Sequence, residues 1–165
     1  MKVIFSHGKE SGPWGSKIKS LAEIAKSAGF EVDSIDYTLT YNPDERVDIL
    51  SSYLAKETDD FVLVGSSMGG YVSLVNAMEL HPKGLFLLAP ALFMPNYAVQ
   101  HYKQTCHTEI VHGWSDTVIP IEHSIQFGEK NKTTLHLIDG DHSLSSSLPT
   151  IEPLFNQFLI VCKGT

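Results

Sequence analysis

The stretch that decides the fold is Phe61-Val62-Leu63-Val64-Gly65-Ser66-Ser67-Met68-Gly69, an apolar run that leads directly into a G-x-S-x-G sequence. An apolar run without polar alternation is typical of a parallel strand that is covered on both faces. A helix is predicted from Ser67 to Leu80, and it ends at His81-Pro82 because the residue before a proline disfavours helical geometry. A strand that turns at once into a helix, with glycines on both sides of Ser67, predicts a tight turn that exposes the hydroxyl group.

The same alternation of short apolar runs and longer segments with helical spacing extends along the rest of the chain. The predicted strands are 3–6, 31–37, 61–65, 84–89, 109–112 and 133–138. The predicted helices are 16–28 with Ser16 as its cap, 42–54 with Asn42 and Pro43 at its start, 67–80, about 120–129, and a fifth that contains 153–161. Such alternation favours right-handed crossovers, so we expect an α/β fold with a doubly wound, mostly parallel sheet of about six strands and helices on both faces.

Length and composition limit the function classes. The 165 residues fit one domain spanning 1–165, and 42% hydrophobic residues are enough to form a core. The formal charge of −7 argues against nucleic acid or an anionic membrane as the main partner.

Cys106 and Cys162 lack the spacing of a zinc or redox motif, so two free thiols are expected, with one disulfide as the alternative. The N-terminus leads straight into a strand and no long apolar run occurs, which favours a cytoplasmic protein.

The turn at Ser67 has a chemical use. It places the hydroxyl at a helix N-terminus, where partial positive charge favours a developing anion. A serine hydroxyl is a weak nucleophile until a neighbouring imidazole accepts its proton, so an activating histidine has to come from elsewhere in the chain. Taken alone, the turn is also compatible with a glycine-rich connection in which Ser67 only caps the helix.

Two later segments complete a pattern that resembles the α/β-hydrolase family. His112-Gly113-Trp114-Ser115-Asp116-Thr117-Val118-Ile119-Pro120 is similar to the family's acid loop, and Asp139-Gly140-Asp141-His142-Ser143 resembles its histidine loop. The order Ser67, Asp116, His142 is also the order of that fold. The resemblance implies a catalytic triad with Ser67 as nucleophile, Asp116 as the acid and His142 as the base.

Other residues compete for these roles. Asp116 judged alone is also compatible with a turn or a helix cap, and Asp139 and Asp141 are expected to be loop residues because a neighbour in sequence seldom faces the imidazole ring. His7 and His112 each precede a glycine at a strand end, and we expect them to shape loops through hydrogen bonds. Surface or core roles are expected for the remaining histidines, which are His81, His101, His107, His123 and His136.

The segment Ser6-His7-Gly8-Lys9-Glu10-Ser11-Gly12-Pro13 resembles the family's oxyanion loop. The resemblance implies that the backbone N–H groups of Lys9 and Met68 form the oxyanion hole, with an ordinary glycine-rich turn as the alternative. Compared with that family, we expect no counterpart of the leading hairpin, and residues 90–106 leave room for a short insertion but not for a lid or cap domain. The candidates for a substrate pocket are Trp14, Phe93, Met94 and Trp114, and packing of the insertion on the sheet is the alternative for its residues.

We therefore expect a small, lid-less serine esterase or thioesterase that forms an acyl-enzyme on Ser67 and needs neither a cofactor nor a metal. Its expected partner is a small-molecule ester or thioester, and not nucleic acid or a membrane. Two alternatives remain, because fold and triad do not define a reaction. One is a ligand- or partner-binding protein with this fold and little turnover. The other is an interaction module whose apolar residues 91–97 are buried in a homodimer.

Overall fold

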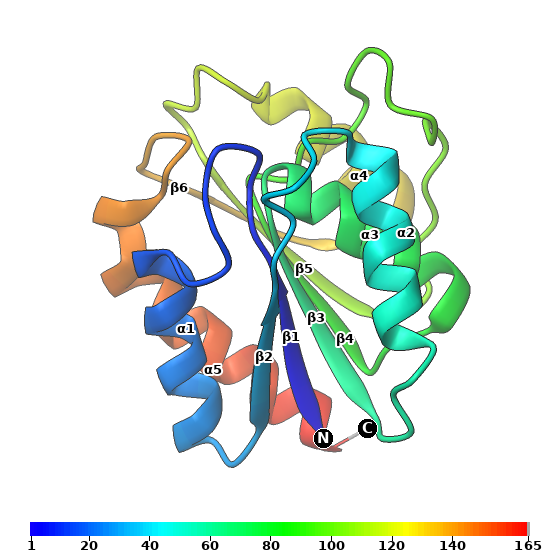
Figure 1. Cartoon of the computed structure of the whole chain (residues 1–165). Coiled ribbons are helices and arrows are strands. Elements are labelled where there is room, and N and C mark those ends of the chain that lie inside the picture. The colour runs from blue at the N-terminus through cyan, green and yellow to red at the C-terminus, as the bar shows by residue number, and fades with distance from the viewer. Residues whose placement is uncertain (165) are drawn as a thin grey trace.

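The computed structural model describes residues 1–164, and Thr165, the last residue of the predicted domain, lies outside the described residues. Six strands form one sheet in the order β2-β1-β3-β4-β5-β6, and each neighbouring pair is parallel (Figure 1). The strands are β1 (Lys2–Ser6), β2 (Glu31–Ile35), β3 (Phe61–Ser66), β4 (Gly84–Leu88), β5 (His107–Gly113) and β6 (Thr134–Ile138). The predicted sheet is confirmed, and it is parallel throughout.

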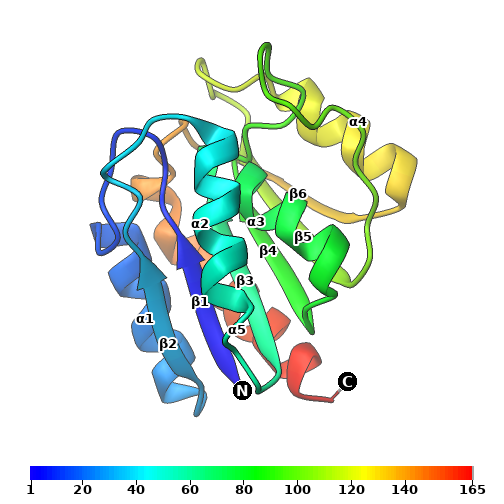
Figure 2. The same cartoon turned by 45° about the vertical axis from the view of Figure 1, so that its right-hand side comes forward.

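Helices cover both faces of the sheet, as the sequence predicted (Figures 1 and 2). The helices are α1 (Ser16–Ser27), α2 (Pro43–Leu54), α3 (Met68–Leu80), α4 (Ile121–Asn131) and α5 (Leu148–Gly164). Alternate residues of β1 point to opposite faces, so Val3 and Phe5 pack with α1 and α5 in one apolar cluster. Ile4, between them, packs in a second cluster with α2, α3 and α4.

The observed ends of the helices show which of the local sequence signals predicted a helix start correctly. The side chain of Asn42 accepts hydrogen bonds from the N–H groups of Asp44 and Glu45 and thereby caps α2 as predicted, with Pro43 as the first helical residue. The cap of α1 is Gly15 and not Ser16, which already belongs to the helix. Helix α5 (Leu148–Gly164) contains the segment 153–161, which was predicted to lie in a helix, and Pro153 lies inside it.

The carboxyl ends of all six parallel strands meet at one edge of the sheet, the upper edge in Figure 1. The loops that follow β1, β3, β5 and β6 therefore come together there, although they are far apart in sequence. This is the edge at which the predicted functional residues are placed.

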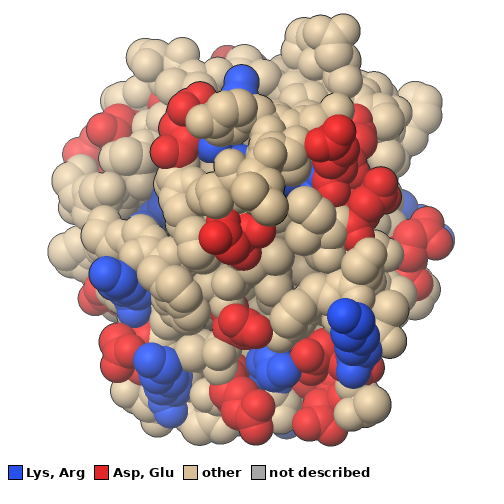
Figure 3. Space-filling model, viewed as in Figure 1, with Lys and Arg blue, Asp and Glu red and all other residues tan. Residues whose placement is uncertain are grey.

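Within residues 1–164 no helix is long and apolar enough to cross a membrane. On the face shown in Figure 3, Lys and Arg side chains alternate with Asp and Glu side chains and do not form a continuous basic patch.

Candidate active site

The turn between β3 and α3 is tight, as the sequence predicted, and its backbone is strained. Ser67 adopts φ 54° and ψ −119°, a backbone conformation that non-glycine residues rarely adopt. A Cβ atom on Gly65 would overlap the carbonyl oxygen of Gly69, and a Cβ atom on Gly69 would overlap that of Ser6. Only glycine fits at either position, so the turn can pack this closely against β1.

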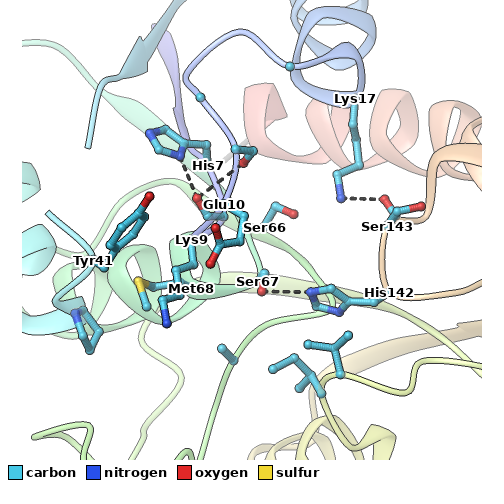
Figure 4. A pocket seen from close by; sticks show the side chains of 18 of the residues that line it. His7, Lys9, Glu10, Lys17, Tyr41, Ser66, Ser67, Met68, His142 and Ser143 are labelled. Carbon is cyan, nitrogen blue, oxygen red and sulfur yellow. Dashed lines mark hydrogen bonds between the residues drawn. The ribbon is translucent and has the colours of Figure 1, made fainter. Parts of the chain in front are cut away.

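Ser67, His142 and Asp116 form a continuous chain of hydrogen bonds. Nε2 of His142 lies 3.0 Å from Oγ of Ser67 (Figure 4), and Nδ1 of the same ring lies 2.8 Å from Oδ2 of Asp116. A carboxylate can only accept, so Nδ1 carries the proton and donates to Asp116. Nε2 is then free to accept the proton of the Ser67 hydroxyl, which is the orientation that a general base requires.

The Asp116 side chain is fully buried and accepts hydrogen bonds at both oxygens. Oδ2 accepts from His142 and also from His112, while Oδ1 accepts from the N–H groups of Val118 and Ile119, each at 2.8 Å. Burial alone raises the pKa of this carboxyl group, but the hydrogen bonds from His142, Ile119 and Val118 outweigh burial and hold the pKa below its ordinary value. Asp116 is therefore an anion placed against the imidazole.

His112 has a more specific contact than the loop-shaping role expected from sequence. Its Nε2 lies 3.0 Å from Oδ2 of Asp116 and 3.2 Å from the carbonyl oxygen of Ile119, and its Nδ1 lies 2.7 Å from Oγ of Ser124. A carbonyl only accepts, so Nε2 carries the proton and Nδ1 accepts from the Ser124 hydroxyl. Burial lowers the pKa of His112, and the neutral ring thus donates to the same carboxylate oxygen of Asp116 as His142 does.

The loop after β1 passes close to Ser67. A Cβ atom on Gly8 would lie 3.5 Å from Cβ of Ser67, so the two backbones are close neighbours. The backbone N–H of Tyr37 donates to Nε2 of His7 at 3.0 Å, which leaves Nδ1 of His7 as the protonated nitrogen. This Nδ1 donates to the carbonyl oxygen of Gly8 at 2.8 Å, and burial lowers the pKa of His7 and favours the neutral ring.

Arg46 holds the same loop, and the sequence analysis did not identify it. The Arg46 side chain is completely buried. It donates hydrogen bonds to the carbonyl oxygens of Thr40 (2.8 Å), Gly8 (3.1 Å) and Lys9 (3.2 Å). No carboxylate of residues 1–164 lies within ion-pair distance of it. The one sequence signal was a charged residue in line with Leu50 on the buried face of α2.

These contacts set the direction of a backbone N–H group. In a planar trans peptide the C=O of Gly8 and the N–H of Lys9 point in opposite directions. Arg46 and His7 both donate to that carbonyl, so together they fix the Lys9 N–H pointing away from them. Met68 is the first residue of α3, and its N–H is one of the N-terminal groups that have no partner within the helix.

A cavity of about 780 Å³ opens beside Ser67 and His142 (Figure 4). Met94 lines it, as expected for a pocket residue. The other three pocket candidates are not among the residues of 1–164 that line it. Trp14 and Trp114 point outward and are 40% and 60% exposed, and the Phe93 ring packs against Tyr102. Apolar or aromatic side chains in the lining that the sequence analysis had not assigned to a pocket include Tyr41, Val118 and Ile119.

The 91–97 segment packs largely on its own chain. Ala91 donates from its backbone N–H to the carbonyl oxygen of Ser67, Leu92 is buried in the core, and the Tyr97 ring contacts Tyr71. The backbone of this segment therefore supports the strained turn, and Ala91, Met94 and Tyr97 form part of the cavity wall. As for metal ligands, the described part of the chain has no cluster of three or more His, Cys, Asp or Glu side chains arranged to hold an ion.

Several solved structures share this fold. A candidate hydrolase of the alpha/beta superfamily from Xanthomonas campestris is 27% identical, with a TM-score of 0.89 over 96% of this chain and 97% of that chain. Est1E from Butyrivibrio proteoclasticus is 19% identical, with a TM-score of 0.80 over 99% and 88%. An α/β serine hydrolase without a lid, also from X. campestris, is 19% identical, with a TM-score of 0.69 over 95% and 80%. A comparison with curated proteins finds no match.

The sheet order, the helices on both faces and these similarities define a member of the α/β-hydrolase superfamily, and residues 1–164 contain no cap domain. More narrowly, the chain belongs to UPF0227, an uncharacterised protein family whose model matches residues 2–102. The match includes Lys9, Arg46 and Ser67 and ends before Asp116 and His142, so the grouping of these last two with Ser67 rests on the geometry.

Proposed function

We propose that the protein is a serine hydrolase that cleaves a small ester or thioester through an acyl-enzyme on Ser67, with His142 and Asp116 completing a catalytic triad. The observation that carries this proposal is the hydrogen-bond chain from Ser67 through His142 to Asp116, 3.0 and 2.8 Å, at the wall of a cavity. The α/β-hydrolase fold and the hydrolase descriptions of similar proteins support hydrolysis in general.

In this mechanism Oγ of Ser67 attacks the substrate carbonyl while Nε2 of His142 accepts the hydroxyl proton. The buried carboxylate of Asp116 stabilises the imidazolium that forms. His142 then donates the proton to the leaving oxygen or sulfur, and the acyl group remains on Ser67. A water molecule, deprotonated by His142 in the same way, attacks the acyl-enzyme and releases the acid.

We assign the stabilisation of the negative charge on the tetrahedral intermediate to the backbone N–H groups of Lys9 and Met68. Each such donor contributes about 3–4 kcal/mol to transition-state stabilisation. The N-terminal end of α3 adds a favourable partial charge at the same place. Because Arg46 and His7 hold the Lys9 peptide from behind, little reorganisation is needed when the charge develops.

The cavity favours a small substrate. Its volume of about 780 Å³ and its apolar side chains suit a molecule of drug-like size, and no cap domain within the described residues closes over it. We assign the whole activity to one domain, because the groups involved all lie at one edge of a single sheet.

The test is labelling with a fluorophosphonate, which reacts with activated serines, followed by mass spectrometry to locate the adduct. We expect an adduct on Ser67 that is absent in Ser67→Ala and strongly reduced in His142→Ala. Active protein is then assayed with p-nitrophenyl acetate and an acetyl thioester. A folded native protein that neither reacts with the probe nor hydrolyses these substrates would contradict the proposal and favour a ligand-binding role.

A further inference from the structure

Lys17 extends from the first turn of α1 to the cavity that contains Ser67 and His142. Its Nζ donates to the carbonyl oxygen of Ser143 at 2.9 Å, and its half-buried side chain forms part of the cavity wall (Figure 4). An ammonium group has three N–H donors, and the bond to Ser143 occupies one of them. The Lys17 ammonium can therefore bind an additional acceptor inside the cavity.

No carboxylate in the described chain forms an ion pair with Lys17. Asp141 and Asp116 act on it only from a longer distance. Asp141 accepts from the Ser143 hydroxyl, and Asp116 is occupied by His142. Burial outweighs the attraction of both carboxylates and lowers the pKa of Lys17 to about 8. The ammonium form of Lys17 thus has no carboxylate in contact with it, and a bound anion would stabilise this charged form.

The residues that line the cavity carry a small excess of positive charge, although the chain as a whole has a formal charge of −7 and Asp116 and Asp141 act on Lys17 from outside the lining. The charged side chains in the cavity lining are Lys9, Glu10 and Lys17. Lys9 and Glu10 are exposed and of opposite sign, so Lys17 is the charge of the lining that has no partner of opposite sign within the lining. The first turn of α1, which borders the same wall, contains no acidic residue.

The side of the substrate that meets Lys17 follows from the direction of proton transfer. In the proposed mechanism His142 donates its proton to the leaving group, so the leaving group lies on the His142 side of Ser67. Ser143 directly follows His142 and holds Lys17 on that side. We infer that the leaving group carries a carboxylate that Lys17 binds, so that the substrate is an ester or thioester of a hydroxy or mercapto acid. This inference rests on the proposed hydrolase function.

The test compares two acetate esters whose leaving groups differ in charge, 4-acetoxybenzoate and methyl 4-acetoxybenzoate, at pH 7. The measured quantity is the ratio of their kcat/KM values, and comparing this ratio between variants cancels the different reactivity of the two esters. A hydrogen bond to a charged group implies that Lys17→Met lowers the ratio by about tenfold. Lys19→Met, which removes an exposed lysine from the same helix, should leave the ratio at its native value. An equal ratio in the native protein and Lys17→Met would overturn the inference.

A second pair, mono-p-nitrophenyl adipate and p-nitrophenyl hexanoate, places the charge on the acyl chain instead. A preference for charge that depends on Lys17 and is confined to this pair would overturn the assignment to the leaving group. The native protein gives a measurement that needs no variant. The ratio for the acetoxybenzoate pair should fall as the pH rises through about 8, because Lys17 loses its charge there.

Binding of the alcohol product separates this inference from the proposed function. We expect calorimetry to show tighter binding of 4-hydroxybenzoate than of its methyl ester to native protein, and no such difference in Lys17→Met. If this selectivity is found but no ester is hydrolysed, the anion site stands and the hydrolase proposal fails. If esters are hydrolysed but the two products bind equally, the hydrolase proposal stands and the anion site fails.

Discussion

Replacing Arg46 by methionine tests whether the oxyanion peptide, which joins Gly8 to Lys9, needs Arg46 to hold its orientation, although Arg46 itself does not contact the substrate. The substitution keeps an unbranched apolar stem inside the protein but removes the donors to the carbonyl oxygens of Thr40, Gly8 and Lys9. His7 still donates to Gly8, so the Lys9 peptide loses one of its two supports on that carbonyl.

The expected fall in kcat follows from the hydrogen bond that His7 still donates to Gly8 in Arg46→Met. Complete loss of an oxyanion donor lowers kcat by about 100- to 1,000-fold. Because the Lys9 peptide keeps His7 but loses its charged support, we expect kcat to fall by about 10- to 100-fold. KM should change by less than about threefold, since this peptide acts on charge that exists only in the transition state. Loss of the buried hydrogen bonds should lower the free energy of unfolding by about 2 kcal/mol.

The assay measures kcat and KM with the best p-nitrophenyl ester, the free energy of unfolding in urea, and inhibition by a boronic acid that forms a tetrahedral adduct with an active serine. Boronate affinity should fall in parallel with kcat, and Arg46→Lys should lie between native and Arg46→Met because it keeps the charge without the planar fork. Tyr53→Phe is the matched control, since it removes a hydrogen bond to Asp33 near the other end of α2. If Arg46→Met lowers kcat no more than Tyr53→Phe does, the reasoning is refuted.

Three further predictions address the triad, the turn and the buried histidines. Asp116→Asn should lower kcat by about 10,000-fold, because an amide favours the wrong His142 tautomer, and an active variant would exclude Asp116 as the acid. Gly69→Ala should lower the free energy of unfolding by more than about 3 kcal/mol, whereas Gly12→Ala, which has open space for a Cβ atom, should change it little. Burial lowers the pKa values of His7 and His112, so the unfolded state binds protons that the folded state does not. The free energy of unfolding should therefore fall as the pH drops below about 6.5, and an unchanged value between pH 7 and pH 5 in urea titrations would contradict this.

The strand–helix order could be predicted because its signals are local. The apolar run before Gly65 and the Asn42-Pro43 pair each act within a few residues of their own position. The sequence also indicated that Ser67, Asp116 and His142 follow strand ends, and parallel strands bring such loops to one edge. The structure places these three side chains within hydrogen-bond distance, while their roles remain predictions.

Lys17 and Arg46 could not be identified from sequence because their partners are backbone carbonyl groups of other loops. Ser143 is separated from Lys17 by 126 positions, and no residue type at 143 is required for its carbonyl to accept. The pocket candidates Phe93, Trp14 and Trp114 were chosen by residue type and loop position. Residue type does not tell which side of a loop a ring occupies, and packing against Tyr102 turns Phe93 away from the cavity.

Arg46 and Lys17, two of the cations beside the proposed site, differ in their access to solvent ions. Arg46 is buried completely, and its charge is stabilised by carbonyl groups and the Tyr37 ring inside the protein, so dissolved salt cannot approach it. Lys17 lines an open cavity, where mobile anions compete for the ammonium group and screen its field. Ionic strength therefore separates two properties of this site, because added salt weakens the selection of an anionic leaving group and leaves the support of the oxyanion peptide unchanged.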